Sequence, residues 1–296
     1  MIATPTRTTT TTTARAARTG AATRGRFRPG GAGLTALTYV IAFIFFFPIL
    51  WTVLTGLKTE ANAVALPPSL LFKPILDHFQ NAITDAGYFA YFRHSAILTI
   101  GSTALAFLLG VPAAYSLGLF PTKRTPSVLS WVLSTKMMPV VGLIVPLIII
   151  YKQFGIYDSY LGMILIYAAM NLPLVIWMMR SFFAEFPREI IEASQIDGAT
   201  FLRTMRSVVL PLVAPGLGAT ALLCVIFAWN EFFIAVNLTG PNTGTLPVYI
   251  SGFMTSEGLF WAKMSAAATL AIAPVFIAGW SAQRSLVRGL TMGAVK

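Results

Sequence analysis

Six apolar stretches, each long enough to cross a lipid bilayer as a helix, dominate the sequence. They cover residues 34–57, 96–119, 128–151, 160–179, 210–236 and 264–282. Backbone groups in the hydrocarbon layer must bond to one another, and continuous apolar runs lack the alternation of barrel strands. Of the 296 residues 56% are hydrophobic and 10% charged, against about 25% charged in a soluble domain. The sequence therefore predicts an all-α polytopic membrane protein with six transmembrane helices.

Residues 1–30 form a separate segment, rich in Thr and Arg, that we expect to be a disordered basic cytoplasmic tail. The apolar run that follows is too long for a secretory signal core, so we interpret it as an uncleaved first helix. Fifteen of the 21 Lys and Arg residues fall in segments that lie inside if the N-terminus is inside. Positive residues concentrate on the cytoplasmic side. Both termini are therefore predicted to be cytoplasmic, and residues 31–296 to form the transmembrane domain.

The longest inner segment, residues 180–211, is more patterned than a connector needs to be. Pro187 suits the first turn of a helix, and Gly198 permits a sharp break. Beyond that break apolar residues recur at helical spacing. They are Phe201, Leu202, Met205, Val208 and Val209. The pattern predicts a helix, a turn and a second short helix beneath the bilayer, for which an ordinary amphipathic hairpin is the simpler alternative.

This segment resembles the EAA loop of ABC importer permeases. The pattern starts at Glu192-Ala193-Ser194, continues through Asp197-Gly198-Ala199 and ends at Val208-Val209-Leu210-Pro211, and Ser194 for the second alanine is its one departure. The resemblance implies the type I importer fold, with this loop coupling the subunit to a separate ATPase. The positions it implicates in coupling are Glu192, Ala193, Ser194, Asp197, Gly198 and Pro211.

The resemblance also implies partners and a location. The partners are an ABC ATPase dimer, a second homologous permease subunit, an extracytoplasmic solute-binding protein and membrane lipid, with no nucleic acid. The location is the bacterial cytoplasmic membrane. The sequence has no G-x-x-x-x-G-K-[ST] phosphate loop. We therefore expect a non-catalytic subunit without a cofactor of its own, with ATP and Mg bound by the partner ATPase.

The C-terminal residues 288–296 look like the tail of the shorter permease in the carbohydrate-uptake class, which reaches into the ATPase dimer. The matching positions are Gly289, Thr291 and Gly293. The run Trp229-Asn230-Glu231-Phe232 is similar to the same class, and residues 134–139 are similar to polyol permeases. The resemblance thus implies a sugar, oligosaccharide or polyol as the substrate.

Polar residues inside the predicted spans are candidates for the substrate path, because a bilayer makes such residues costly. These candidates are Lys136, Asn171, Asn230 and Glu231. For Lys136 three roles are open: lining the path, pairing with a neighbouring subunit, or extending its ammonium to the membrane surface. For Asn171 two are open: a hydrogen bond to substrate or one to another helix. Glu231 is expected near the outer end of its helix with a structural or gating role. The single cysteine, Cys224, predicts no metal site.

Three other classes of protein compete with this interpretation. A secondary transporter or channel subunit should show repeated halves or several midplane ionisable groups, whereas Lys136 stands alone. A membrane enzyme should show a cluster of acids, bases or metal ligands. An ABC importer for a non-carbohydrate solute stays open, because the coupling loop carries no information about the cargo.

Overall fold

A computed structural model describes residues 29–255 and 258–292, with side-chain surroundings for part of these. Residues 1–28 of the predicted tail, and Gly293, lie outside the described residues. The chain divides into two compact units, Met1–Pro48 and Ile49–Lys296. The first contains most of α1 (Pro29–Gly56), and the second, unit 2, contains all the other helices and strands.

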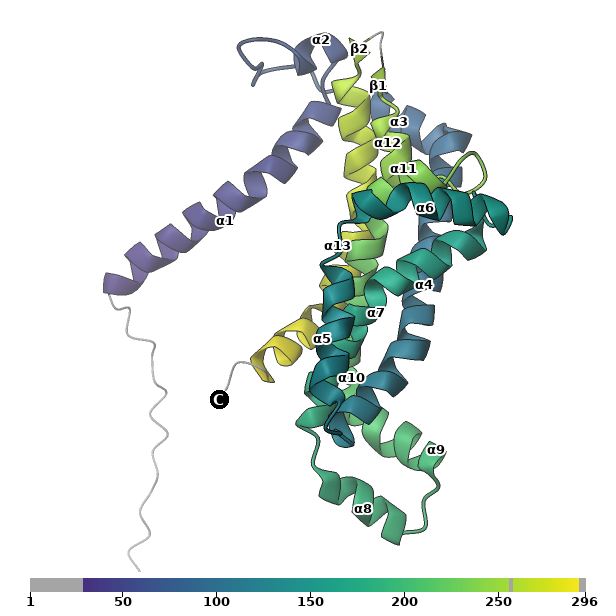
Figure 1. Cartoon of the computed structure of the whole chain (residues 1–296). Coiled ribbons are helices and arrows are strands. Elements are labelled where there is room, and N and C mark those ends of the chain that lie inside the picture. Colours follow the sequence, from purple (N-terminus) through teal and green to yellow (C-terminus); the bar gives the residue numbers. More distant parts are fainter. Residues whose placement is uncertain (1–28, 256–257, 293–296) are drawn as a thin grey trace, which may run out of the picture. The chain divides into compact units, whose positions relative to one another are not determined.

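The regular secondary structure of unit 2 is almost entirely helical (Figure 1). Its elements, in chain order, are α2 (Glu60–Ala63), α3 (Asp77–Thr84), α4 (Ala86–Leu119), α5 (Thr125–Lys136), α6 (Val140–Gln153), α7 (Tyr160–Ala184), α8 (Arg188–Ile196), α9 (Phe201–Thr204), the π-helix η1 (Met205–Val209), α10 (Leu210–Trp229), α11 (Phe233–Leu238), α12 (Leu246–Ser251), β1 (Met254–Thr255), β2 (Gly258–Leu259) and α13 (Trp261–Met292). The two strands pair antiparallel as a short hairpin.

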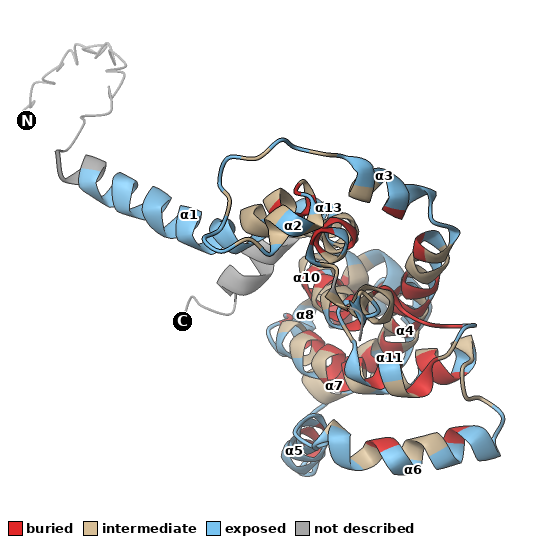
Figure 2. Ribbon diagram, turned by 90° about the horizontal axis from the view of Figure 1, so that it is seen from above, coloured by how far each residue is buried: buried red, intermediate tan, exposed pale blue. Residues whose placement is uncertain are grey.

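The core forms where α4, α7 and α10 pack together, and buried residues gather on their facing sides (Figure 2). Glycines let α4 approach α7 closely. A Cβ at Gly110 would lie 2.7 Å from Val175 Cγ1, and one at Gly118 would lie 2.7 Å from Phe183 Cβ. Small residues serve this purpose in membrane bundles, where helices gain van der Waals contact by close approach.

Within the part of the chain that the structure describes, five helices are long and apolar enough to cross a membrane, and the count reaches six if one bent pair forms a single span. That pair is α5 and α6, which meet at an angle of 84°. The one span expected over residues 128–151 is therefore broken into two helices. Pro139 caps α6 in an extended conformation (φ −63°, ψ 110°), and a proline disfavours helix at the residue before it.

The fifth apolar segment also differs from the sequence-based expectation. The apolar helical run begins at Phe201 and continues for 29 residues to Trp229, so the second short helix beneath the bilayer is the start of the span. The π-turn of η1 ends at Val209, two residues before Pro211, whose missing N–H and ring disturb the preceding turn. The span ends at Trp229, short of the expected residue 236, and α11 is a separate helix.

The carboxylate of Asp158 holds the connection between α6 and α7 against the connection between α11 and α12. Asp158, in a left-handed conformation (φ +50°), accepts hydrogen bonds from the segment that follows α11. Its Oδ1 accepts from the Gly240 N–H (2.8 Å) and from the Thr243 N–H (3.0 Å) and hydroxyl (2.7 Å). Its Oδ2 accepts from the N–H (3.2 Å) and side-chain amide (3.0 Å) of Asn242.

Candidate functional site

The patterned segment begins with α8, a helix whose two ends are both defined by sequence. Pro187 stands at its N-cap in an extended conformation. At the other end Gly198 adopts φ +75°, the left-handed region that side chains disfavour. The Gly198 N–H donates to the Gln195 carbonyl and the Ala199 N–H to the Ser194 carbonyl, both at 3.0 Å. These two bonds form a Schellman C-cap, so the predicted break at Gly198 is confirmed.

One face of α8 is anchored to the rest of unit 2. Ile191 is buried and packs in the same core cluster as Phe186, Val209 and Val213. The Ser194 hydroxyl lies 2.9 Å from the Thr204 hydroxyl of α9 and donates to the Ile191 carbonyl at 2.8 Å. The serine that departs from the EAA pattern thus links α8 to the start of the long helical run.

The other face of this segment is open in the isolated chain. Glu192, Ala193 and Asp197 are exposed. Beside them Ile196 is 86% exposed, Leu202 78% and Phe201 64%. The predicted apolar stripe is therefore divided, because Val209 is buried while Phe201 and Leu202 face outward. Exposed apolar residues among charged ones are typical of a protein-binding surface. Pro211 is also exposed but is the second residue of α10, within the span.

A second candidate site lies among α5, α7 and α10, where three predicted residues come together. Lys136, Asn171 and Glu231 line one pocket of about 200 Å³. The other residues that line it are Tyr167, Met170, Phe227 and Ala228. Lys136 ends α5 and donates from Nζ to the Met170 carbonyl at 2.8 Å. Asn171 is buried and donates from Nδ2 to the Cys224 carbonyl at 3.4 Å.

Glu231 is placed by hydrogen bonds rather than by a helix. It follows α10 and comes before α11, where its Oε1 accepts from the Ile234 N–H (2.8 Å). Its Oε2 accepts from the Ala235 N–H (3.0 Å) and from the Tyr167 hydroxyl (2.9 Å). We expected Glu231 within one helix that spans residues 210–236. This was wrong, because α10 stops at Trp229. Tyr167 was missed, since a tyrosine within an apolar span carries no sequence signal of its partner.

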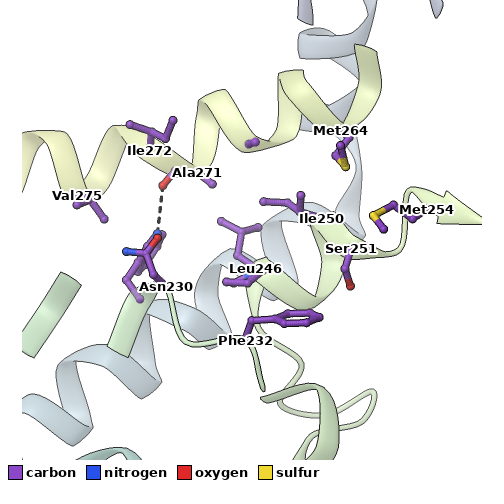
Figure 3. A pocket seen from close by; sticks show the side chains of 13 residues that line it. Asn230, Phe232, Leu246, Ile250, Ser251, Met254, Met264, Ala271, Ile272 and Val275 are labelled. Carbon is purple, nitrogen blue, oxygen red and sulfur yellow. Dashed lines mark hydrogen bonds between the residues drawn. The ribbon is translucent and has the colours of Figure 1, made fainter. Parts of the chain in front are cut away.

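Asn230 belongs to a different and larger cavity, of about 550 Å³, among α10, α12 and α13 (Figure 3). Its Nδ2 donates back to the Ile226 carbonyl at 2.8 Å. The lining is mostly apolar and includes Phe232, Leu246 and Ile272, and a hydrogen bond from Trp229 Nε1 to the Ala271 carbonyl (3.1 Å) crosses it. This lining has few groups for binding the hydroxyls of a polar solute.

The predicted tail positions are only partly described. The backbone of Gly289 and Thr291 continues α13, while Gly293 lies beyond the described residues. Among the residues that the structure describes, no group of three or more His, Cys, Asp or Glu side chains could hold a metal ion.

A family of transport proteins and several of its named members match this chain. The family described as binding-protein-dependent transport system inner membrane component matches residues 106–291. The probable ABC transporter permease protein y4oR of Sinorhizobium fredii is 37% identical and covers 87% of this chain and 92% of its own length. The sulfoquinovosyl glycerol transport system permease protein SmoH of Agrobacterium fabrum is 34% identical over 84% of this chain and 88% of its own.

Two further similarities extend the comparison. The trehalose transport system permease protein SugB of Mycobacterium tuberculosis is 33% identical over 84% of this chain and 92% of its own. A crystal structure of a bacterial ABC transporter involved in the import of the acidic polysaccharide alginate has the same fold. That chain matches with a TM-score of 0.70 at 21% identity, over 87% of this chain and 96% of its own.

The apolar helices, with a structured loop between two of them, define a multi-pass helical membrane protein. The chain belongs to the family of inner membrane components of binding-protein-dependent transport systems. It is therefore a non-catalytic permease subunit of an ABC importer. This confirms the family that the loop at residues 180–211 indicated, while the roles of individual loop residues stay predictions.

Proposed function

We propose that this chain is one of two permease subunits in a bacterial cytoplasmic-membrane importer for a sugar, oligosaccharide or polyol, with both termini inside. An ATPase dimer binds ATP and Mg, and a solute-binding protein delivers substrate from outside. The names of relatives support a carbohydrate, since they include permeases for trehalose and sulfoquinovosyl glycerol. A secondary transporter or channel is disfavoured, because the chain belongs to a family of binding-protein-dependent transport systems.

We propose that α8 couples this subunit to the ATPase, because one side of the helix is packed against the bundle and the other is exposed. Ile191 and Ser194 fix one side to the bundle, while Glu192, Ala193 and Ile196 are open on the other. A carboxylate among small and apolar residues provides a directional, charge-assisted contact within a close-packed interface. We assign this exposed side to the ATPase, with the tail at Gly289, Thr291 and Gly293 as a second predicted contact.

The fold offers a direct mechanical route from this surface to the polar pocket. α8 is fastened to α9, and the helical run continues from Phe201 to Trp229 without a gap. At 1.5 Å per residue, those 29 residues extend about 44 Å. Glu231 lies two residues beyond the end of that run, and its hydrogen bond to Tyr167 joins it to α7. Movement of α8 by the ATPase would therefore displace Glu231 and change the shape of the pocket.

The pocket around Lys136 is our proposed part of the substrate path. Its partner Met170 is the eleventh of 25 residues in α7, so the ammonium lies at mid-height of a span. A charge at such depth is costly against lipid and faces a bundle interior or a water-filled cavity instead. Lys136 and Asn171 are therefore proposed to line this path, with Glu231 shaping it and Asn230 left outside.

Site-specific photocrosslinking tests the assignment of the α8 surface. A photoreactive phenylalanine at Ile196 should crosslink to the ATPase subunit in the assembled transporter. The matched control is Leu71, which is 97% exposed and lies in the segment between α2 and α3. Figure 1 draws these two helices at the opposite end of unit 2 from α8, so position 71 should give no ATPase adduct. Intact complexes without an adduct from position 196, or with equal adducts from both positions, would rule out the assignment.

A further inference from the structure

We infer that the Lys136 pocket selects carbohydrates that carry an anionic group, such as a carboxylate or sulfonate, and that Lys136 binds that group. This inference rests on the proposed function, because it takes the pocket to be part of the substrate path. It narrows the substrate class from carbohydrates in general to acidic ones.

The ammonium of Lys136 has donors to offer. A lysine has three N–H donors, and the described contacts of Nζ are the Met170 carbonyl at 2.8 Å and the Phe227 ring, whose centroid is 5.3 Å away. One donor is therefore used, and the side chain is exposed in the isolated subunit. Two remaining donors match the two or three oxygens of a carboxylate or sulfonate.

The acid in the same pocket is already engaged. Both oxygens of Glu231 accept hydrogen bonds, from two backbone N–H groups of α11 and from the Tyr167 hydroxyl, at 2.8 to 3.0 Å. Hydrogen bonds to an ionised group are stronger than neutral ones and hold it in place. The hydrogen bonds of Glu231 thus stabilise the break between α10 and α11. Lys136 is the charged residue of this pocket whose N–H donors are open to a ligand.

The setting makes an anion a better match for this lysine than a hydroxyl. The surrounding wall is largely apolar, since Lys136 and Met170 also line a second pocket of about 240 Å³ with residues such as Val140 and Ile166. In low-dielectric surroundings a charge gains most from an opposite charge, and a hydroxyl leaves it uncompensated. Phe227, 51% exposed, adds a flat apolar surface for a sugar ring.

The test compares uptake of two sugars that differ only in charge: a glucosyl disaccharide and its uronic acid counterpart. Proteoliposomes would contain the assembled transporter with its binding protein, and carry wild type, Lys136→Gln or Lys136→Arg. The ratio of uronate to neutral uptake should fall about tenfold in Lys136→Gln, the size expected for one lost charge-assisted hydrogen bond. Lys136→Arg should largely restore it.

Lys152 is the matched control, because its Nζ lies at the same 5.3 Å from an aromatic ring, that of Tyr157, outside the pocket. Lys152→Gln should leave the ratio unchanged. An unchanged ratio in Lys136→Gln, or wild-type uptake of the neutral sugar alone, overturns this inference while the carbohydrate function stands. Failure of the wild type to take up any of a panel of neutral and acidic sugars would instead contradict the proposed function.

Discussion

Asp158 joins two segments that lie 82 to 85 residues apart in the sequence, through its bonds to Gly240, Asn242 and Thr243. Partial burial alone would raise the pKa of its carboxyl, but the hydrogen bonds from the Thr243 hydroxyl and the three backbone N–H groups hold that pKa below its usual value. The ionised carboxylate is therefore the form that fastens the segments. Asparagine at this position could not accept from all these donors.

We predict that Asp158→Asn lowers the Tm of the purified subunit at neutral pH. Because the folded pKa is depressed, the stabilisation is fully present above the unfolded value of about 3.9 and is lost as pH falls through the folded pKa. The Tm difference between wild type and variant should thus shrink below about pH 4. A difference that stayed constant across the acid range would contradict this account of Asp158.

At the scale of elements, α8 offers two isoleucines with opposite surroundings, Ile191 at 7% exposure and Ile196 at 86%. Ile191→Ala removes buried methyl groups and should destabilise the subunit by about 2–5 kcal/mol, seen as a lower Tm. Ile196→Ala should leave the Tm unchanged but reduce the amount of ATPase that co-purifies. If both variants behaved alike in the two measurements, the two-sided description of α8 would be wrong.

Much of this element structure could be predicted from sequence, and its limits have physical causes. Hydropathy locates apolar helices well. The turn at Gly198 could also be predicted, because it depends on a positive φ that glycine itself permits and on no distant partner. The bend between α5 and α6 and the stop at Trp229 were not predicted, because apolar residues resume within a few positions of each break, at Val140 and at Phe232. The partners of Glu231 escaped for another reason: Tyr167 is 64 residues away in the sequence, and only tertiary packing brings the two side chains together.

At the scale of the whole molecule, one helical connection joins the loop at 180–211, where we propose that the ATPase acts, to the polar pocket, where we propose that substrate passes. Gly198 is the position where this connection is most easily altered without disturbing the bundle. A Cβ there meets no atom within 4 Å, so a substitution acts through the positive φ, at about 1–2 kcal/mol, and through contacts with a partner. Gly155 is its match, with φ +66° and equal free space.

The most direct test is sugar uptake per ATP hydrolysed in proteoliposomes that contain the assembled transporter with Gly198→Asp or Gly155→Asp. Both variants have a similar backbone cost, so both should insert and assemble. We predict that Gly198→Asp lowers uptake per ATP at least about tenfold, a coupling loss of roughly 1.4 kcal/mol, while Gly155→Asp stays near wild type. Normal uptake per ATP by an assembled Gly198→Asp transporter would contradict the account.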